Sequence, residues 1–127
     1  MMKSKKLLIC EPMSGKTFEQ IDNERKLFIK TLDRKKYEPV GNLTPSEFIG
    51  SEDDVFEVKN GAIYCLAQSI DAMSRCDTVL FRPGWENARG CQIEHMVATE
   101  YGLEILYEDG NGNFYDNLHS VVMEGNF

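Results

Sequence analysis

Hydrophobic and polar residues follow one another in blocks along this chain, and the blocks predict strands that alternate with helices. Four short apolar runs are typical of buried strands, because they are bounded by charges or turn residues and are too short for an average helix. They are KKLLIC at 5–10, YEPVG at 37–41, DTVLF at 77–81 and LEILY at 103–107. Between these runs the apolar residues recur every three or four positions or so, which is the spacing of one face of a helix.

The segment after the first strand predicts a helix over 17–33. Thr17 is a residue type that favours the N-cap position, and Gln20 three positions later completes a capping box. The apolar residues of the segment fall on one helical face: Phe18, Ile21, Phe28, Ile29 and Leu32. Charged residues occupy the opposite face, as expected of a helix that packs on a sheet.

Two further segments, at about 57–75 and 90–101, also predict helices. One face of the first carries the apolar residues Ile63, Leu66, Ala67, Ile70 and Met73. Residues 42–56 are polar and rich in turn formers, and we expect an irregular excursion there. A turn at 109–113 leads to SVVM at 120–123, which predicts either a fifth strand or a last helical turn.

Strands that alternate with helices predict an α/β domain of three layers, in which a four- or five-stranded parallel sheet lies between helices. In such sheets, ligands bind beyond the carboxyl ends of the strands where the strand order reverses. If 37–41 and 77–81 pair on opposite sides of 5–10, the reversal lies between 5–10 and 77–81. The loops PMSGK (12–16) and RPGWENARG (82–90) then border the crevice.

The composition fits a single globular domain over residues 1–127, with 42% hydrophobic and 28% charged residues. The apolar part of MMKSKKLLIC is too short for a secretory signal, and no run of about 18 apolar residues is available to span a membrane. We therefore expect a cytoplasmic protein without a membrane partner. A net charge of −7 argues against a nucleic-acid polymer as partner but not against a small anionic ligand.

The four cysteines predict buried free thiols rather than disulfides or metal ligands. They are scattered through apolar segments without a C-x-x-C pair, at Cys10, Cys65, Cys76 and Cys91. Cys91 and His95 are the only neighbouring soft ligands at helical spacing, and two ligands are too few for a zinc site. We therefore expect no metal.

The PMSGK loop could bind an anion. Its small residues precede a helix start, whose free N–H groups and positive dipole end suit a phosphate or carboxylate, and Lys16 could add charge. The loop is shorter than a P-loop and lacks the P-loop spacing. An ordinary strand-to-helix turn is the alternative interpretation.

The loop after the third strand gathers polar side chains around the only tryptophan of the chain. Arg82, Glu86, Asn87 and Arg89 lie beside Trp85. A tryptophan prefers burial or a stacking partner, and an aromatic plane near an arginine and an amide suits a nucleobase or another ring-shaped ligand. A solvated connection is the alternative.

On the helix at 90–101, Glu94 borders the apolar stripe of Ile93 and Val97, whereas His95 is expected to point toward solvent. Glu94 also falls in the predicted first turn, where the helix dipole favours the ionised, nucleophilic carboxylate. A glutamate that only satisfies free N–H groups is the alternative. Because no Ser-His-Asp set or C-x5-R loop is recognisable, carboxylate chemistry is the main catalytic option.

Three segments together resemble the nucleoside 2-deoxyribosyltransferase-like superfamily, and above all its short, uncharacterised bacterial and phage branch. They are LLICEPMSGK at 7–16, CDTVLFRPGWENARG at 76–90 and CQIEHMVATEYGLEIL at 91–106. The resemblance implies a flavodoxin-like sheet and an activity on N-glycosidic bonds of deoxynucleosides or deoxynucleotides. In that superfamily the deoxyribosyl group passes to another base or to water.

The resemblance places the nucleophilic glutamate at Glu94. It also implies that the first loop binds the sugar or 5′-phosphate, that no metal or organic cofactor is needed, and that neighbouring subunits of a homo-oligomer complete the pocket. We expect Trp85 to stack on or wall the base, and Asn87 and Arg89 to hold polar edges of the ligand. The full set of candidate substrate-binding residues is Pro12, Met13, Ser14, Gly15, Lys16, Trp85, Glu86, Asn87, Arg89 and Gly90.

The chain departs from the superfamily pattern at three positions. Active relatives carry a hydroxyl or carboxylate where this chain has Ala88, and an aspartate where it has Ser69. Glu11 replaces the usual glycine before the first-loop proline, where it could supply the missing acid or obstruct the site.

The leading hypothesis is therefore an enzyme that cleaves or transfers the N-glycosidic bond of a deoxynucleoside or deoxynucleotide through Glu94. The alternative is a non-catalytic nucleotide-binding or sensing module, which a nucleotide would stabilise without turnover. Different chemistry on the same scaffold is the third possibility, since a fold does not fix a function.

Overall fold

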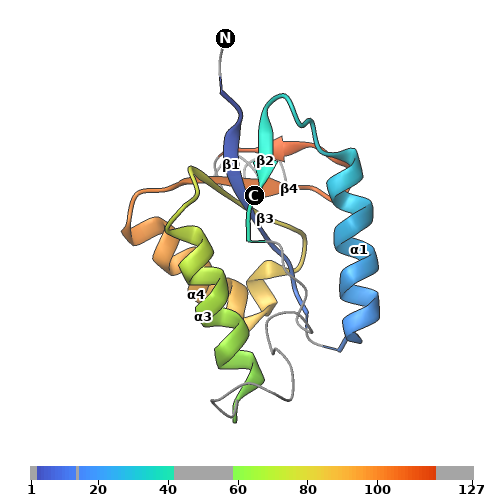
Figure 1. Ribbon diagram of the computed structural model, residues 1–127, viewed down its shortest axis with the longest axis vertical. Coiled ribbons are helices and arrows are strands. Elements are labelled where there is room, and N and C mark those ends of the chain that lie inside the picture. Colours follow the sequence, from blue (N-terminus) through green and yellow to red (C-terminus); the bar gives the residue numbers. More distant parts are fainter. Residues whose placement is uncertain (1–2, 14, 42–58, 117–127) are drawn as a thin grey trace, which may run out of the picture.

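The computed structural model describes residues 3–13, 15–41 and 59–116 of the chain (Figure 1). Ser14, the expected excursion at 42–56 and the segment 120–123 lie outside the described residues, as does the side chain of Phe18. The described residues form a five-stranded sheet with helices on both faces, so the predicted α/β class is confirmed.

The strand order of the sheet is β2-β1-β3-β4-β5. The strands are β1 (Lys5–Cys10), β2 (Tyr37–Pro39), β3 (Thr78–Phe81), β4 (Glu104–Glu108) and β5 (Phe114–Tyr115). The first four are parallel, as predicted, with Cys10 opposite Phe81 and Phe81 opposite Tyr107. β5 instead runs antiparallel to β4, with Tyr107 opposite Tyr115.

A compact turn after β4 explains the antiparallel edge strand, which the sequence pattern did not predict. The Asp109 carboxylate accepts the N–H groups of Asn111 and Asn113 at 2.7 and 3.1 Å, and the Asp109 N–H donates to the Asn113 carbonyl at 3.1 Å. This turn reverses the chain within a few residues, whereas a parallel fifth strand would need a long crossover connection.

The described residues contain three α-helices, α1 (Phe18–Thr31), α3 (Gly61–Met73) and α4 (Arg89–Glu100), and a 3₁₀ turn, η1 (Trp85–Asn87). The predicted capping box of α1 is confirmed: Gln20 N–H donates to the Thr17 hydroxyl at 3.1 Å, and Thr17 N–H donates to the Gln20 side chain at 2.7 Å. The predicted start of α3 near residue 57 is wrong. Asn60 is the N-cap, because its side-chain oxygen accepts the Ile63 N–H at 3.0 Å.

The helices and the sheet form the three layers of a flavodoxin-like fold. α1 covers one face of the sheet, and α3 and α4 cover the other (Figure 1). Alternate residues of β1 point to opposite faces: Leu7 and Ile9 pack with Phe28 of α1, while Leu8 and Cys10 belong to the core under α3 and α4. All four cysteines are buried free thiols, as predicted.

The strand order places the topological switch point between β1 and β3, as the sequence predicted. The loops that leave these two strands are in close contact. Gly84 has a φ of +91°, and a Cβ added there would lie 3.2 Å from Pro12 Cγ. Because only glycine adopts this conformation readily and leaves room for the proline, Gly84 fixes how the two loops meet.

No helix of the described segments has the length and apolar character needed to cross a membrane.

Candidate functional site

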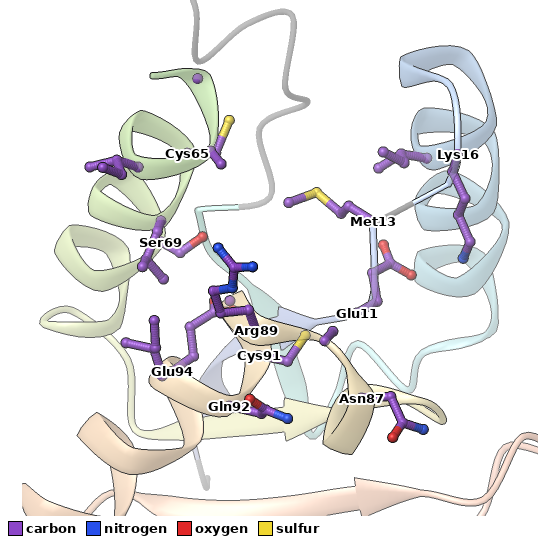
Figure 2. Close-up of a pocket in the computed structure, with 18 of the residues that line it drawn as sticks. Glu11, Met13, Lys16, Cys65, Ser69, Asn87, Arg89, Cys91, Gln92 and Glu94 are labelled. Atoms are coloured by element: carbon purple, nitrogen blue, oxygen red, sulfur yellow. The ribbon is translucent and has the colours of Figure 1, made fainter. Parts of the chain in front are cut away.

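A pocket of about 940 Å³ opens at the switch point, between the loop after β1 and the N-terminal parts of α3 and α4 (Figure 2). Its volume lies within the range of about 300–1,000 Å³ that small-molecule sites occupy. The lining includes Glu11 after β1, Ser69 on α3, and Ala88 and Glu94 from the segment after β3. The pocket therefore forms where the fold class predicts a ligand site.

The structure brings together six of the residues that the sequence singled out. Those that line the pocket are Met13, Lys16, Asn87, Arg89, Gly90 and Glu94. Pro12, Gly15, Trp85 and Glu86 are not among the lining residues, and Ser14 lies outside the described residues.

Trp85 packs in the core, which corrects the expectation that its ring walls a bound base. It is only 8% exposed, and its ring stacks on His95 with the ring centroids 4.3 Å apart. Phe81 of β3 also packs against the indole, with the two ring centroids 5.2 Å apart. The η1 turn explains the difference, because it turns the indole back over the sheet instead of out into the crevice.

His95 does not point into solvent, so that prediction is also wrong. Its ring is half-buried between α4 and the sheet, and its Nε2 lies 2.7 Å from the Tyr107 hydroxyl. Burial lowers the pKa of His95. The helical wheel failed here because the indole of Trp85 covers a face of α4 that would otherwise be solvated.

Glu94 lies in the second turn of α4, because the helix begins at Arg89, and it is 8% exposed. Burial raises its pKa, although hydrogen bonds from Cys10 and Ser69 and the charge of Arg25 act in the opposite direction. The predicted position in the first turn of the helix is therefore wrong. The dominant influence on this carboxyl group is its removal from water.

The three positions at which the chain departs from the superfamily pattern, Glu11, Ser69 and Ala88, all line the pocket. Ser69 reaches across from α3 and hydrogen-bonds Glu94. Ala88 is the N-cap of α4 and offers no side-chain acceptor to the first N–H groups of the helix. Residues 69, 88 and 94 thus share one cavity, although they come from different elements.

Glu11 is anchored by two arginines. Its Oε1 accepts Arg25 Nε at 3.1 Å, and its Oε2 accepts Arg82 Nη1 at 3.0 Å. Arg82 also pairs with Glu108 at 3.4 Å and lies over the Phe28 ring, 4.2 Å from its centroid. Because each carboxylate oxygen of Glu11 already binds a guanidinium, this side chain is poorly suited to donate a proton.

The remaining charges of the pocket differ in their partners. Lys16 forms an ion pair with Glu24 at 2.7 Å. Arg89 has no ion pair or side-chain hydrogen bond within the described part of the chain, and its guanidinium points into the cavity (Figure 2). Arg89 is therefore the charged side chain best placed to meet a ligand.

Sequence reasoning missed the contact between Cys10 and Glu94. The Cys10 thiol donates to Glu94 Oε2 at 3.2 Å, from the last residue of β1 to the second turn of α4. The available signal was that Cys10 ends the strand at the switch point. Cys65 and Cys91 also line the pocket.

No group of three or more His, Cys, Asp or Glu side chains is placed to hold a metal ion, as far as residues 3–13, 15–41 and 59–116 are concerned.

A protein-family model described as a domain of unknown function (DUF4406) matches residues 5–107. No curated protein and no solved structure matches the chain. The matched range extends from the start of β1 into β4 and includes every residue that lines the pocket.

Proposed function

The chain belongs to the family described as a domain of unknown function (DUF4406), and we propose that it cleaves the N-glycosidic bond of a deoxynucleoside or deoxynucleotide, with the sugar passing to water or to another base. The observation that carries this proposal is the buried Glu94 carboxyl group on the wall of a pocket at the switch point of the sheet.

The proposed reaction begins with attack of a Glu94 carboxylate oxygen on the anomeric carbon. The bond to the base breaks, its electron pair leaves with the base, and the base takes up a proton from water. The resulting glycosyl ester is then attacked by water or by a second base, which restores the carboxylate. A pocket of about 940 Å³ has room for the sugar and the base beside Glu94.

The resemblance to the nucleoside 2-deoxyribosyltransferase-like superfamily supports the same assignment. The superfamily nucleophile corresponds to Glu94, and the two positions that would carry its polar partners, Ser69 and Ala88, line the same pocket. In this proposal Met13 and Lys16 contact one end of the ligand, and Asn87, Arg89 and Gly90 contact the other polar edges. No metal or organic cofactor takes part.

A non-catalytic nucleotide-binding module is the second candidate, and the surroundings of Glu11 favour it. Ala88 and Ser69 lack the acidity to protonate a departing base, and Glu11 is bound by Arg25 and Arg82. A pocket without a proton donor would hold a nucleotide without cleaving it. Both candidate functions therefore predict that the pocket binds a nucleotide, but only the enzyme is expected to turn it over.

Two further features belong to the same proposal. We place the protein in the cytoplasm, since four buried free thiols suit a reducing compartment. We also expect a homo-oligomer, as the resemblance implies. Met96 and Tyr101 of α4 and the turn after it, 60% and 81% exposed, are apolar surface that a second subunit could cover.

Release of free base tests the proposal. The purified protein would be incubated with a panel of deoxynucleosides and their 5′-monophosphates, and the products separated by chromatography. Glu94→Gln is the inactive comparison, and Gln68→Glu, on α3 and outside the pocket lining, is a control that makes the reverse exchange of amide and carboxylate at another site. Thermal unfolding with each ligand is recorded in parallel.

Base release by the native protein and by Gln68→Glu, but not by Glu94→Gln, is the expected result. Thermal stabilisation without release of base would favour the binding module. Neither release nor stabilisation with any member of the panel would overturn both candidates.

A further inference from the structure

A buried hydrogen bond joins Glu94 to the carboxyl end of β1. The Cys10 Sγ and Glu94 Oε2 atoms are 3.2 Å apart, although the two residues are 84 positions apart in the sequence. Cys10 is 2% exposed and Glu94 is 8% exposed. The contact is therefore shielded from water, where even a weak donor has a larger effect on a carboxyl group.

Cys10 is the donor in this contact. Burial, the neighbouring Glu94 and the nearby Cys91 together raise the pKa of the Cys10 thiol well above its ordinary value. The thiol therefore keeps its proton at neutral pH, and a thiol proton can point only to an acceptor such as the carboxylate.

Glu94 forms no direct ion pair with any of the described residues. Ser69 of α3 hydrogen-bonds the same carboxyl group, Arg25 of α1 acts on it through its charge, and Cys91 is a neighbour on α4 itself. Neutral donors therefore hold the carboxylate without neutralising it, so its negative charge stays available to attack an electrophile.

The orientation of the carboxyl group follows from the same contacts. Oε2 is fixed by the thiol at the end of β1. Oε1 lies beside Gly90, 4.0 Å from where a Cβ would stand, on a part of the pocket wall that has no side chain. The thiol thus anchors Oε2, while Oε1 lies beside Gly90, which has no side chain to cover it.

We propose that Cys10 is a positioning residue, whose thiol holds one oxygen of Glu94 so that the other is presented to the ligand. The inference deepens the proposed function and rests on it for its effect on catalysis. Its structural part, the influence of the thiol on the Glu94 carboxyl group, does not depend on any activity.

The test uses three replacements of Cys10. Cys10→Ser keeps a donor, whereas Cys10→Ala and Cys10→Val remove it, the valine with little change in volume. Cys76→Ala is the matched control, because Cys76 is a buried thiol that donates to the Ala72 carbonyl at 3.3 Å and does not touch the pocket. The first readout is the titration of Glu94, followed by the NMR signal of its labelled side-chain carboxyl carbon. The second is base release as a function of pH.

Loss of the donor should move the midpoint of the Glu94 titration to higher pH in Cys10→Ala and Cys10→Val, because the ionised form loses a hydrogen bond. Cys10→Ser and Cys76→Ala should stay close to the native midpoint. Base release by Cys10→Ala should fall about three- to tenfold on the acid side of the profile and approach the native rate at high pH, where Glu94 is ionised in both proteins. A merely structural defect would lower the rate equally at every pH.

An unchanged Glu94 midpoint in both variants that lack a donor would overturn the inference, whatever their activity. A rate loss that does not depend on pH would also overturn it. If the native protein releases no base at any pH, the proposed function fails, and the titration still decides whether Cys10 acts on Glu94. If Cys10→Ala does not fold, Cys10→Val gives the same comparison.

Discussion

The Arg25 guanidinium lies 3.1 Å from the Glu11 carboxylate, and the two side chains are 9% and 3% exposed. Arg25 belongs to α1 and Glu11 directly follows β1, so this ion pair ties the helix to the end of the strand beside the pocket. Arg82 binds the second oxygen of Glu11 at 3.0 Å and joins the end of β3 to the same carboxylate. The wall of the pocket is thus held by a buried network of charges.

Removal of the Glu11 charge should destabilise the fold strongly. Glu11→Gln takes a buried anion away from Arg25, whereas Arg82 keeps its ion pair with Glu108, and we expect a loss of about 3 kcal/mol in the free energy of unfolding measured with urea. Asp71→Asn is the control, because its ion pair with Arg75 has side chains 58–59% exposed, and its loss should cost at most about 0.5 kcal/mol. Similar costs for the two variants would contradict a structural role for Glu11.

Glu94→Gln should stabilise the protein at neutral pH. Because the pKa of Glu94 is raised in the folded chain, the stability that this group contributes is complete below the unfolded value of 4.5 and is lost as pH rises through the folded-state pKa. Because glutamine does not ionise, the Glu94→Gln variant does not lose stability in this way as pH rises. The free energy of unfolding measured with urea should therefore be higher for the variant than for the native protein. The difference should grow as pH rises above 4.5, until Glu94 is fully ionised.

Glu104→Gln is the control, because its effect on stability should depend on pH in the opposite direction. Hydrogen bonds from Lys5 and Thr78 lower the pKa of Glu104, so its contribution is present above 4.5 and is lost as pH falls through the folded-state pKa. This variant should be less stable than the native protein at neutral pH and equal to it in acid. If the stability of Glu94→Gln changes with pH in the same direction as that of Glu104→Gln, burial is not the main influence on the pKa of Glu94.

Gly90→Ala should raise stability and lower activity. Gly90 is helical, and an added Cβ would have Glu94 Oε1 at 4.0 Å as its nearest neighbour, so alanine fits and should add about 0.5–1 kcal/mol to the free energy of unfolding. The new methyl group would stand in the pocket next to Glu94 Oε1, the oxygen that we propose reacts, and would hinder a ligand. Thermal unfolding and base release measure the two effects.

Gly102→Ala provides the contrast at the other end of α4. Gly102 has a φ of +71° and open space around it, so alanine there should cost about 1 kcal/mol through backbone strain and leave base release unchanged. Unaltered base release in Gly90→Ala would mean that the ligand does not approach this wall.

Arg89→Gln should weaken binding of 5′-monophosphates more than binding of nucleosides. A guanidinium with no partner among residues 3–13, 15–41 and 59–116 is available to bind a phosphate, and loss of such a charge-assisted contact costs on the order of 10- to 100-fold in affinity. Lys16→Gln should have a smaller effect, because Lys16 already pairs with Glu24. Calorimetric titration of both variants with a nucleoside and its monophosphate decides between them, and a larger effect of Lys16 would place the anion at the first loop.

The fold could be predicted from the sequence because its signals are local. Apolar runs separated by helical spacing define the order of the elements, and Thr17 with Gln20 marks the start of α1 within four residues. The location of the switch point followed from the condition that 37–41 and 77–81 pair on opposite sides of 5–10, which the strand order meets. The antiparallel β5 was missed because a hydrogen-bonded turn around Asp109, rather than an apolar run, decides its direction.

The site could be predicted only in part, because its contacts join residues that are far apart in the chain. Glu94 was identified from its place on the helix, but Cys10 and Glu94 are 84 positions apart, and Arg82 and Glu11 are 71 apart. Trp85 shows the same limit: a tryptophan that walls a ligand and one that packs on Phe81 and His95 look alike in sequence. The aromatic cluster depends on the η1 turn, which residue types alone do not specify.

The proposed role of Glu94 as nucleophile is tested most directly by peptide mapping of the protein quenched with acid during incubation with the deoxynucleoside panel. We predict a deoxyribosyl unit esterified to Glu94 in the native protein and no modified peptide in Glu94→Gln. A deoxyribosyl unit on another residue, or release of base with no modified peptide at all, would contradict the account.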